Sequence, residues 1–214
     1  MKPVQRLASG HGPIALAMTG ASGAQYGLRL VQCLLGAGRD VQLVLSKPAQ
    51  MVLGMETDEK LPGRPQEIER HLSELHGARP GQLRVFGPEE WTAPLASGSN
   101  PPAAMVVCPC SMATAAGIAQ GSSRNLIERA ADVALKERRT LVLVPRETPL
   151  SIIHLENLAR LARAGAIVLP ANPGFYHRPQ SVGELVDFVV ARVLDHVGVE
   201  HSLIKRWGEE PAEG

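Results

Sequence analysis

The stretch IALAMTGASGAQYGLRLVQCLLGAGRDVQLVL, residues 14–45, decides the fold. Residues 14–19 form a short, continuously apolar run closed by Gly20, which is typical of a buried strand. Residues 24–37 carry Leu and Val at helical spacing, and residues 41–45 are again short and apolar. The stretch therefore predicts a strand, a helix and a second strand, which is the repeating unit of a parallel sheet.

The same alternation continues along the chain. Residues 47–80 are mostly helical and polar, residues 82–86 resemble a strand, and a Pro/Gly/Ser loop runs to residue 102. Further strands are expected at 104–108, 141–144 and 166–169, with helices over about 125–138, 151–164 and 181–197. Asn125 is the expected N-cap of the first of these helices, with Glu128 as its capping-box partner. We predict a three-layer α/β fold of the Rossmann or flavodoxin type, with a doubly wound, mainly parallel sheet covered by helices on both faces.

The composition fits one domain and argues against several classes of function. For 214 residues, 44% of them hydrophobic, we expect a flexible extension at 1–13, a single domain at 14–207 and a tail at 208–214. A net charge of +1 and 3% aromatic residues argue against nucleic-acid binding. No apolar run approaches the roughly 18 residues of a membrane span. The three cysteines, two of them in Cys108-Pro109-Cys110, predict free thiols in a reducing cytoplasm and no zinc site.

Small, hydroxyl and charged residues follow the predicted strands, where a doubly wound sheet binds its ligands. They are the turn Gly20–Gly23, then Ser46 and Lys47, Ser111 to Thr114, Arg146 with Glu147, and Tyr176 in a Gly/Pro loop. The glycine turn precedes a helix, so it is a candidate phosphate cradle, although such turns more often only reverse the chain. Its GxxGxxxG spacing, with Ser46 after the second strand, departs from the NAD fingerprint and favours a mononucleotide.

Several of these residues have a purely structural alternative. Arg129 and Lys136 lie seven apart on one helix face, which is more typical of a solvated, salt-bridged face than of an anion site. Cys108 and Cys110 are more typical of small buried residues than of redox or metal-binding groups. Trp207 fits core packing as well as a substrate contact. Opposite charges directly after a buried strand, as in Arg146-Glu147, instead favour a functional role.

Six blocks of sequence, in order, resemble the UbiX-type flavin prenyltransferases over about residues 14–207. They are Ala17–Gly27, Cys108–Thr114, Asn125–Glu137, Leu143–Glu147, Pro173–Tyr176 and the helix ending at Arg192. The resemblance implies a metal-independent enzyme that joins a dimethylallyl group from dimethylallyl phosphate to N5 and then C6 of reduced FMN. A fourth ring closes and inorganic phosphate leaves. It further implies that the prenylated FMN serves UbiD-type decarboxylases, as in ubiquinone biosynthesis, and that the chain forms a dodecamer with sites at subunit junctions.

The resemblance also implies roles for individual residues. Those that match flavin contacts are Gly20, Ala21, Ser22, Ser46, Ser111, Met112, Ala113, Thr114 and Arg146. Those that match groups around the prenyl phosphate are Arg129, Lys136, Glu147, Tyr176 and Arg192. Glu56 matches a residue near flavin N5, and Trp207 matches an aromatic wall. Catalytic roles are therefore expected for Ser22, Glu56, Lys136, Glu147, Tyr176 and Trp207.

Two other functions stay open at this point. One is an FMN-dependent decarboxylase of the cysteine-peptide or phosphopantothenoylcysteine type, on a similar sheet. Such enzymes use a catalytic His, for which the sequence offers no position after the first helix. The other is a non-catalytic FMN carrier, or a scaffold for a decarboxylase.

Overall fold

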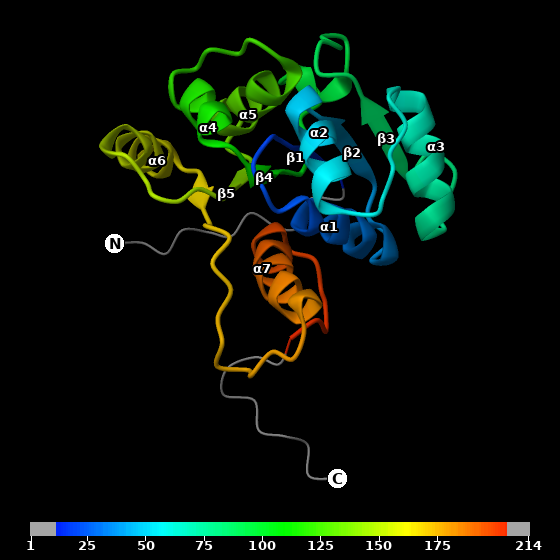
Figure 1. Cartoon of the computed structure of the whole chain (residues 1–214). Coiled ribbons are helices and arrows are strands. Elements are labelled where there is room, and N and C mark those ends of the chain that lie inside the picture. Colours follow the sequence, from blue (N-terminus) through cyan, green and yellow to red (C-terminus); the bar gives the residue numbers. More distant parts are fainter. Residues whose placement is uncertain (1–11, 205–214) are drawn as a thin grey trace.

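The computed structural model describes residues 12–204, which form a parallel sheet between two layers of helices (Figure 1). The predicted tail, Trp207 and nearly all of the predicted N-terminal extension lie outside these residues. The sheet has the order β3-β2-β1-β4-β5-β6, and each neighbouring pair is parallel. The strands are β1 (Ile14–Met18), β2 (Val41–Leu45), β3 (Leu83–Phe86), β4 (Ala104–Cys110), β5 (Thr140–Pro145) and β6 (Ile167–Val168). The doubly wound fold predicted from the sequence is confirmed.

Helices cover both faces of the sheet. One layer contains α1 (Ala24–Gly36), α2 (Lys47–Glu56), α3 (Pro65–His76) and α7 (Val182–Val197). The other contains α4 (Met112–Ala119), α5 (Leu126–Lys136), α6 (Ile152–Ala164) and the short 3₁₀ helix η1 (Pro94–Ala96). Figure 1 shows α4 and α5 on one side of the sheet and α1 and α7 on the other. No helix within residues 12–204 is both long and apolar enough to cross a membrane.

The strands are apolar throughout because both of their faces are buried. In β1, Ile14, Leu16 and Met18 face the core beneath α1 and α7. Ala15 and Ala17 face the opposite core beneath α4 and α5. This two-residue period explains why a strand covered on both sides shows no polar alternation in its sequence.

The close approach of α1 to the sheet requires a glycine. A Cβ atom at Gly27 would lie 2.7 Å from the carbonyl oxygen of Cys108 in β4 and 2.5 Å from Cε of Met18. A side chain at this position would therefore push α1 away from the junction of β1 and β4.

Helix α4 was not predicted from the sequence analysis, which assigned no element between residue 108 and the helix expected from about residue 125. The strand β4 runs on to Cys110, and α4 begins at Met112. Its sequence, MATAAGIA, is short and rich in small residues, with buried positions that include Met112, Ala115 and Gly117. Because such a helix has no polar stripe, helical periodicity does not reveal it.

The start of α5 matches the prediction with one difference. The side chain of Asn125 accepts a hydrogen bond from the Glu128 amide at 2.9 Å, so Asn125 is the N-cap. The Glu128 carboxylate accepts a bond from the amide of Arg124 at 2.9 Å, one residue before the N-cap. The expected capping box is therefore shifted by one residue.

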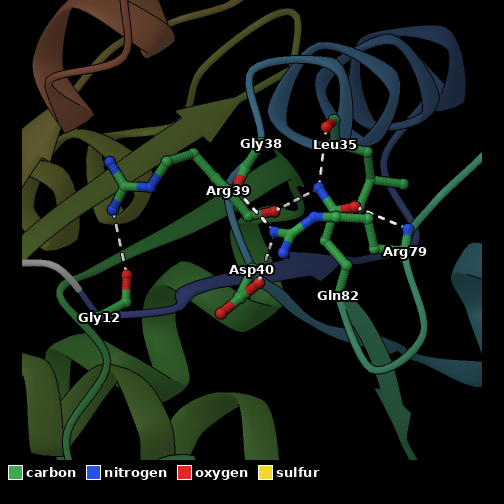
Figure 2. Close-up of polar contacts among 7 residues, drawn as sticks. All are labelled: Gly12, Leu35, Gly38, Arg39, Asp40, Arg79 and Gln82. Atoms are coloured by element: carbon green, nitrogen blue, oxygen red, sulfur yellow. Dashed lines mark hydrogen bonds and ion pairs between the residues drawn. The ribbon is translucent and has the colours of Figure 1, made fainter.

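Polar side chains connect the loops at the amino-terminal edge of the sheet (Figure 2). The buried side chain of Gln82 donates to the carbonyl oxygens of Leu35 at 2.8 Å and Arg39 at 3.2 Å, and accepts from the Arg79 amide at 2.9 Å. The guanidinium of Arg39 donates to the carbonyl oxygen of Gly12 at 3.0 Å. These bonds connect the turn between α1 and β2 to the residues that precede β3 and β1, at the edge opposite the predicted ligand site.

Candidate functional site

The candidate site lies at the carboxyl ends of β1 and β4, the two central strands. The chain leaves β1 toward α1 on one face of the sheet and leaves β4 toward α4 on the other face. Loops diverge at such a switch point and leave a crevice, in which doubly wound proteins bind ligands. The sequence predicted this edge from the small and hydroxyl residues that follow the strands.

Thr19 connects the two loops that border this crevice by hydrogen bonds. Its hydroxyl group donates to the carbonyl oxygen of Pro109 at 2.9 Å and accepts from the amide of Ser111 at 2.7 Å. The Thr19 amide also donates to the Pro109 carbonyl at 3.1 Å. Thr19 is 2% exposed, so water does not compete for these bonds. Sequence reasoning did not single out Thr19, whose only signal is a hydroxyl residue at the end of an apolar strand.

The glycine turn after β1 is shaped by close packing and by an unusual backbone conformation. A Cβ atom at Gly20 would lie 2.5 Å from Cβ of Pro48 in α2. Gly23, the N-cap of α1, has φ 108°, in the left-handed region that favours glycine, and has no side chain to cap the helix. The first amides of α1 therefore need an acceptor from elsewhere in the chain.

Glu56, the last residue of α2, supplies that acceptor. Its Oε2 accepts hydrogen bonds from the amides of Gly23 at 2.8 Å and Ala24 at 3.0 Å. The anion at this helix end is thus a carboxylate of the chain itself, which occupies the amides that the glycine turn offered as a candidate phosphate cradle. The sequence placed Glu56 at the site through the family resemblance only.

Glu56 is held in its ionised form. Burial raises the pKa of Glu56, but hydrogen bonds from the Ser22 side chain and from the Ala24 and Gly23 amides, with the positive charge of Arg146, outweigh that effect. The pKa of the carboxyl group is therefore below its usual value. Ser22 and Glu56, each of which is expected to have a catalytic role, are in contact.

Arg146 joins the end of β5 to the turn after β1. Its amide donates to the carbonyl oxygen of Cys110 at 3.4 Å, and its Nε donates to the carbonyl oxygen of Ser22 at 3.2 Å. The guanidinium therefore spans the carboxyl end of β4. Its neighbour Glu147 is exposed and accepts a bond from the Thr148 amide at 3.1 Å.

Two of the predicted hydroxyl residues are N-caps. Ser46 accepts from the Ala49 amide at 3.1 Å at the start of α2. Ser111 accepts from the Thr114 amide at 3.3 Å at the start of α4, and the two hydroxyl oxygens are 3.1 Å apart. A capping serine uses an oxygen lone pair, so its hydroxyl hydrogen can still be donated. Met112 and Ala113 form the first turn of α4, where Met112 is buried and Ala113 is exposed.

Tyr176 lies in the segment between β6 and α7. This segment starts beside β5, because the amide of Ala171 donates to the Pro145 carbonyl at 3.0 Å. The Tyr176 ring is 52% exposed and packs edge-on against Phe188 of α7, with 5.7 Å between ring centroids. The phenol therefore stands on the surface of α7.

The three predicted phosphate-binding cations each form a local ion pair. Arg129 contacts Asp132 at 3.1 Å and also donates from Nε to the carbonyl oxygen of Ala96 at 3.0 Å. Lys136 pairs with Glu137 beside Gly98. Arg192 pairs with Asp195 on α7 at 2.8 Å. In a single chain, Arg129 and Lys136 therefore show the structural alternative, a salt-bridged helix face.

Lys136 lies at the opposite edge of the sheet from Arg146. Helix α5 ends at Lys136, shortly before Thr140, the first residue of β5. Thr140 pairs with Ala104, the first residue of β4, so the end of α5 is near the amino ends of the strands. One chain therefore does not bring Lys136 to the switch point.

The cysteines provide no reactive thiol at this site, and the cavity described below lies elsewhere. Burial raises the pKa of the Cys110 thiol to about 12 and also raises the pKa of Cys108, so neither thiol is activated. A cavity of about 120 Å³ lies instead at the carboxyl ends of β2 and β3, between Lys47, Ile68 and Phe86. Residues 12–204 contain no group of three or more His, Cys, Asp or Glu that could hold a metal ion.

Comparisons with known proteins identify the family. The family model named Flavoprotein matches residues 3–194. The chain is 59% identical over 202 residues to the flavin prenyltransferase UbiX of Pseudomonas aeruginosa, across 94% of this chain and 97% of that protein. The crystal structure of AnUbiX (PadA1) in complex with FMN and dimethylallyl pyrophosphate matches with a TM-score of 0.82 and 40% identity, over 94% of this chain and 99% of that one.

A second solved structure is described as an assembly. The dodecameric, FMN-dependent UbiX-like decarboxylase from Escherichia coli O157:H7 matches with a TM-score of 0.81 and 41% identity, over 92% of this chain and 100% of that one. The sequence matches span nearly the whole length of these proteins, and the resemblance predicted from the six sequence blocks is confirmed. The chain belongs to the UbiX family of flavin prenyltransferases.

Proposed function

We propose that this chain transfers a dimethylallyl group from dimethylallyl phosphate to N5 and C6 of reduced FMN. The C–O bond of the donor breaks as its terminal carbon bonds to N5, and the N5 proton leaves with the phosphate as inorganic phosphate. The isoprene double bond then opens: one alkene carbon takes up a proton, the other bonds to C6, and the C6 proton leaves. The observation that carries the proposal is the group of Ser22, Glu56 and Arg146 at the switch point of the sheet, in a chain 59% identical to a flavin prenyltransferase. The product serves decarboxylases of the UbiD type.

The donors at the switch point fit an anionic mononucleotide. They are the Arg146 guanidinium, the hydroxyl groups of Ser46, Ser111 and Thr114, and the amino-terminal ends of α2 and α4. Gly20 and Ala21 belong to the turn next to these groups, where the missing Cβ of Gly20 lets the turn pack against Pro48 of α2. Bound reduced FMN supplies the electron-rich N5 and C6 atoms.

Glu56 and Ser22 are assigned to the protons that leave N5 and C6. The Ser22 hydroxyl donates to the Glu56 carboxylate, so a proton that reaches Ser22 can pass to the carboxylate along this hydrogen bond. Glu147 and Tyr176 pass a proton to the departing phosphate. The cations Arg129, Lys136 and Arg192 neutralise its charge.

The complete site needs a neighbouring copy of the chain. Lys136 is at the far edge of the sheet, while Ser22 and Arg146 are at the switch point. Helix α6 also exposes an apolar surface at its start, with Leu150, Ile152, Ile153 and Leu155 each 41% to 67% exposed. Exposed apolar patches of this kind are typical of protein interfaces. We therefore propose a homo-oligomer, as in the dodecameric relative, in which one copy supplies flavin-side groups and another supplies cations. The three free thiols support a reducing, cytoplasmic location.

The test is a transfer assay under anaerobic conditions. Purified protein is incubated with reduced FMN and dimethylallyl phosphate, or with the diphosphate, and the flavin is analysed by mass spectrometry. We expect a new flavin heavier by one prenyl unit. Unmodified FMN as the sole flavin would reject the transferase, whereas the product would exclude a mere carrier. Release of CO₂ from a cysteine peptide by the oxidised protein, without prenyl transfer, would favour the decarboxylase.

A further inference from the structure

The amino-terminal end of α1 and the carboxyl-terminal end of α2 cap one another. Gln25 provides one of the two caps. From the first turn of α1, Nε2 of Gln25 donates to the backbone carbonyl oxygen of Glu56 at 3.0 Å. The Glu56 carboxylate in turn accepts from the Gly23 and Ala24 amides at 2.8 and 3.0 Å. The backbone of Glu56 is thus bound by the same turn of α1 that binds its side chain.

Each partner supplies what the other helix lacks. Gly23 leaves the amino-terminal amides of α1 without a side-chain cap. At the end of α2, the amide and the hydroxyl group of Thr57 both donate to the carbonyl oxygen of Leu53. The Glu56 carbonyl is left for Gln25. The last carbonyls of a helix have no partner within it and carry partial negative charge, so a side-chain donor there is stabilising.

The carboxylate alone does not fix the end of α2. A glutamate side chain has several rotatable bonds, so bonds to its carboxylate still allow the backbone behind it to shift. The bond from Gln25 removes that freedom because it binds the backbone of the same residue. The Glu56 carboxylate is held by the α1 amides and the Glu56 backbone is held by Gln25. In this position the carboxylate also accepts a hydrogen bond from Ser22.

We propose that Gln25 is a positioning residue for the transfer reaction. It holds the end of α2 so that the Glu56 carboxylate stays on the α1 amides and beside Ser22. The inference rests on the proposed function, in which Glu56 and Ser22 receive protons from the flavin. Gln25 acts through Glu56 and is not proposed to contact either substrate.

The test compares a variant that removes the donor with one that keeps it. Gln25→Met has nearly the same shape but no donor, whereas Gln25→Lys can still donate to the Glu56 carbonyl. Gln66→Met, at an exposed position on α3, is the matched control. We expect Gln25→Met to lower kcat about tenfold, because one hydrogen bond contributes up to about that factor. The KM for dimethylallyl phosphate and the Kd for FMN should stay within about twofold. Gln25→Lys and Gln66→Met should keep most of the wild-type kcat.

A second readout does not depend on activity. Hydrogen–deuterium exchange of the peptide that contains Gly23 and Ala24 should be faster in Gln25→Met than in the wild type and in Gln66→Met, since the cap is loosened. The acid limb of the pH–rate profile should also move to higher pH, because a loosely held Glu56 loses the bonds that lower its pKa.

Three results would overturn the inference. These are a wild-type kcat in Gln25→Met, an equal loss in Gln25→Lys, or unchanged exchange at Gly23 and Ala24. If Gln25→Met does not fold, Gln25→Ala takes its place as the donor-free variant. If the wild type transfers no prenyl group, the proposed function fails, and the exchange of the α1 amides alone decides whether Gln25 holds Glu56.

Discussion

The switch point of the sheet and the outer faces of α5 and α7 both carry predicted site residues, but the two regions are held in different ways. At the switch point, side chains bond to partners far away in the sequence, such as Arg146 to Ser22 and Glu56 to Gly23. On α5 and α7, each cation forms an ion pair with a residue no more than three positions away. Their side chains are 34% to 47% exposed.

This difference indicates which part of the proposed site a single chain can form. Bonds between distant segments fix the groups at the switch point, the proposed flavin side, before any ligand arrives, and such preorganised groups stabilise charge most effectively. Exposed ion pairs contribute little to stability, so a ligand can displace their carboxylates at small cost. On the proposed function, these cations bind an anion at a junction with another copy of the chain. The following changes test this division, beginning with the largest expected effect.

Loss of the proton donors should slow transfer while leaving the flavin bound. We expect Glu147→Gln and Tyr176→Phe each to lower kcat by about 10²- to 10⁴-fold, the usual contribution of general acid–base catalysis. FMN affinity should not change, because neither side chain belongs to the network at the switch point. Steady-state kinetics and flavin fluorescence titration measure the two quantities. Glu156→Gln, at an exposed position on α6, is the control. Loss of flavin binding in either variant would contradict their placement on the phosphate side.

Loss of Arg146 should affect the flavin side first. Arg146→Ala removes the guanidinium that bonds to Ser22 and faces the switch point. We expect the Kd for FMN to rise about 10- to 100-fold, as for the loss of a hydrogen bond to a charged group. Fluorescence titration gives the Kd, and Arg163→Ala, exposed in the last turn of α6, provides the matched control. An unchanged Kd would place the flavin elsewhere.

Loss of Arg129 should affect the other substrate. We expect Arg129→Ala to raise the KM for dimethylallyl phosphate about tenfold, with the Kd for FMN within about twofold, because Arg129 is outside the switch-point network. Equal changes in both constants would contradict the division between the two regions.

A mixture of two variants tests whether neighbouring copies share a site. Arg146→Ala and Arg129→Ala chains are unfolded together and refolded, and transfer is compared with that of each variant alone. Shared sites should regain activity, because some junctions then combine an intact Arg146 from one copy with an intact Arg129 from another. No gain over the separate variants would mean that each chain uses its own residues.

The smallest effect is expected from Thr19, which supports the site without facing the ligand. Thr19→Val keeps the shape of the side chain but leaves the Ser111 amide without its acceptor. We expect a loss of about 1–3 kcal/mol in the free energy of unfolding, as for a buried unsatisfied group. Denaturant unfolding measures it, with the exposed Thr92→Val as control. A change within the error of that control would mean that water replaces the hydroxyl group.

The sequence predicted the parts of the fold that depend on local pattern. Continuous apolar runs such as residues 14–19 revealed buried strands, and the charged pair Arg146-Glu147 after such a run pointed to the ligand edge. Helix α4 was missed because its small residues, buried along much of its surface, carry no amphipathic period. Thr19 was missed because its importance comes from Pro109 and Ser111, 90 and 92 residues away.

By itself the amino-acid sequence determined the order of strands and helices apart from α4, the edge at which the candidate site is expected and the family to which the chain belongs. The pattern of apolar residues and six blocks of motif suffice for these, since both are written along the chain. Only the tertiary structure decided that Glu56 caps α1, that Gln25 holds Glu56, and that Lys136 lies at the far edge of the sheet. These facts depend on how α2 packs against α1 and on where α5 ends, and such packing brings together residues that no local spacing relates.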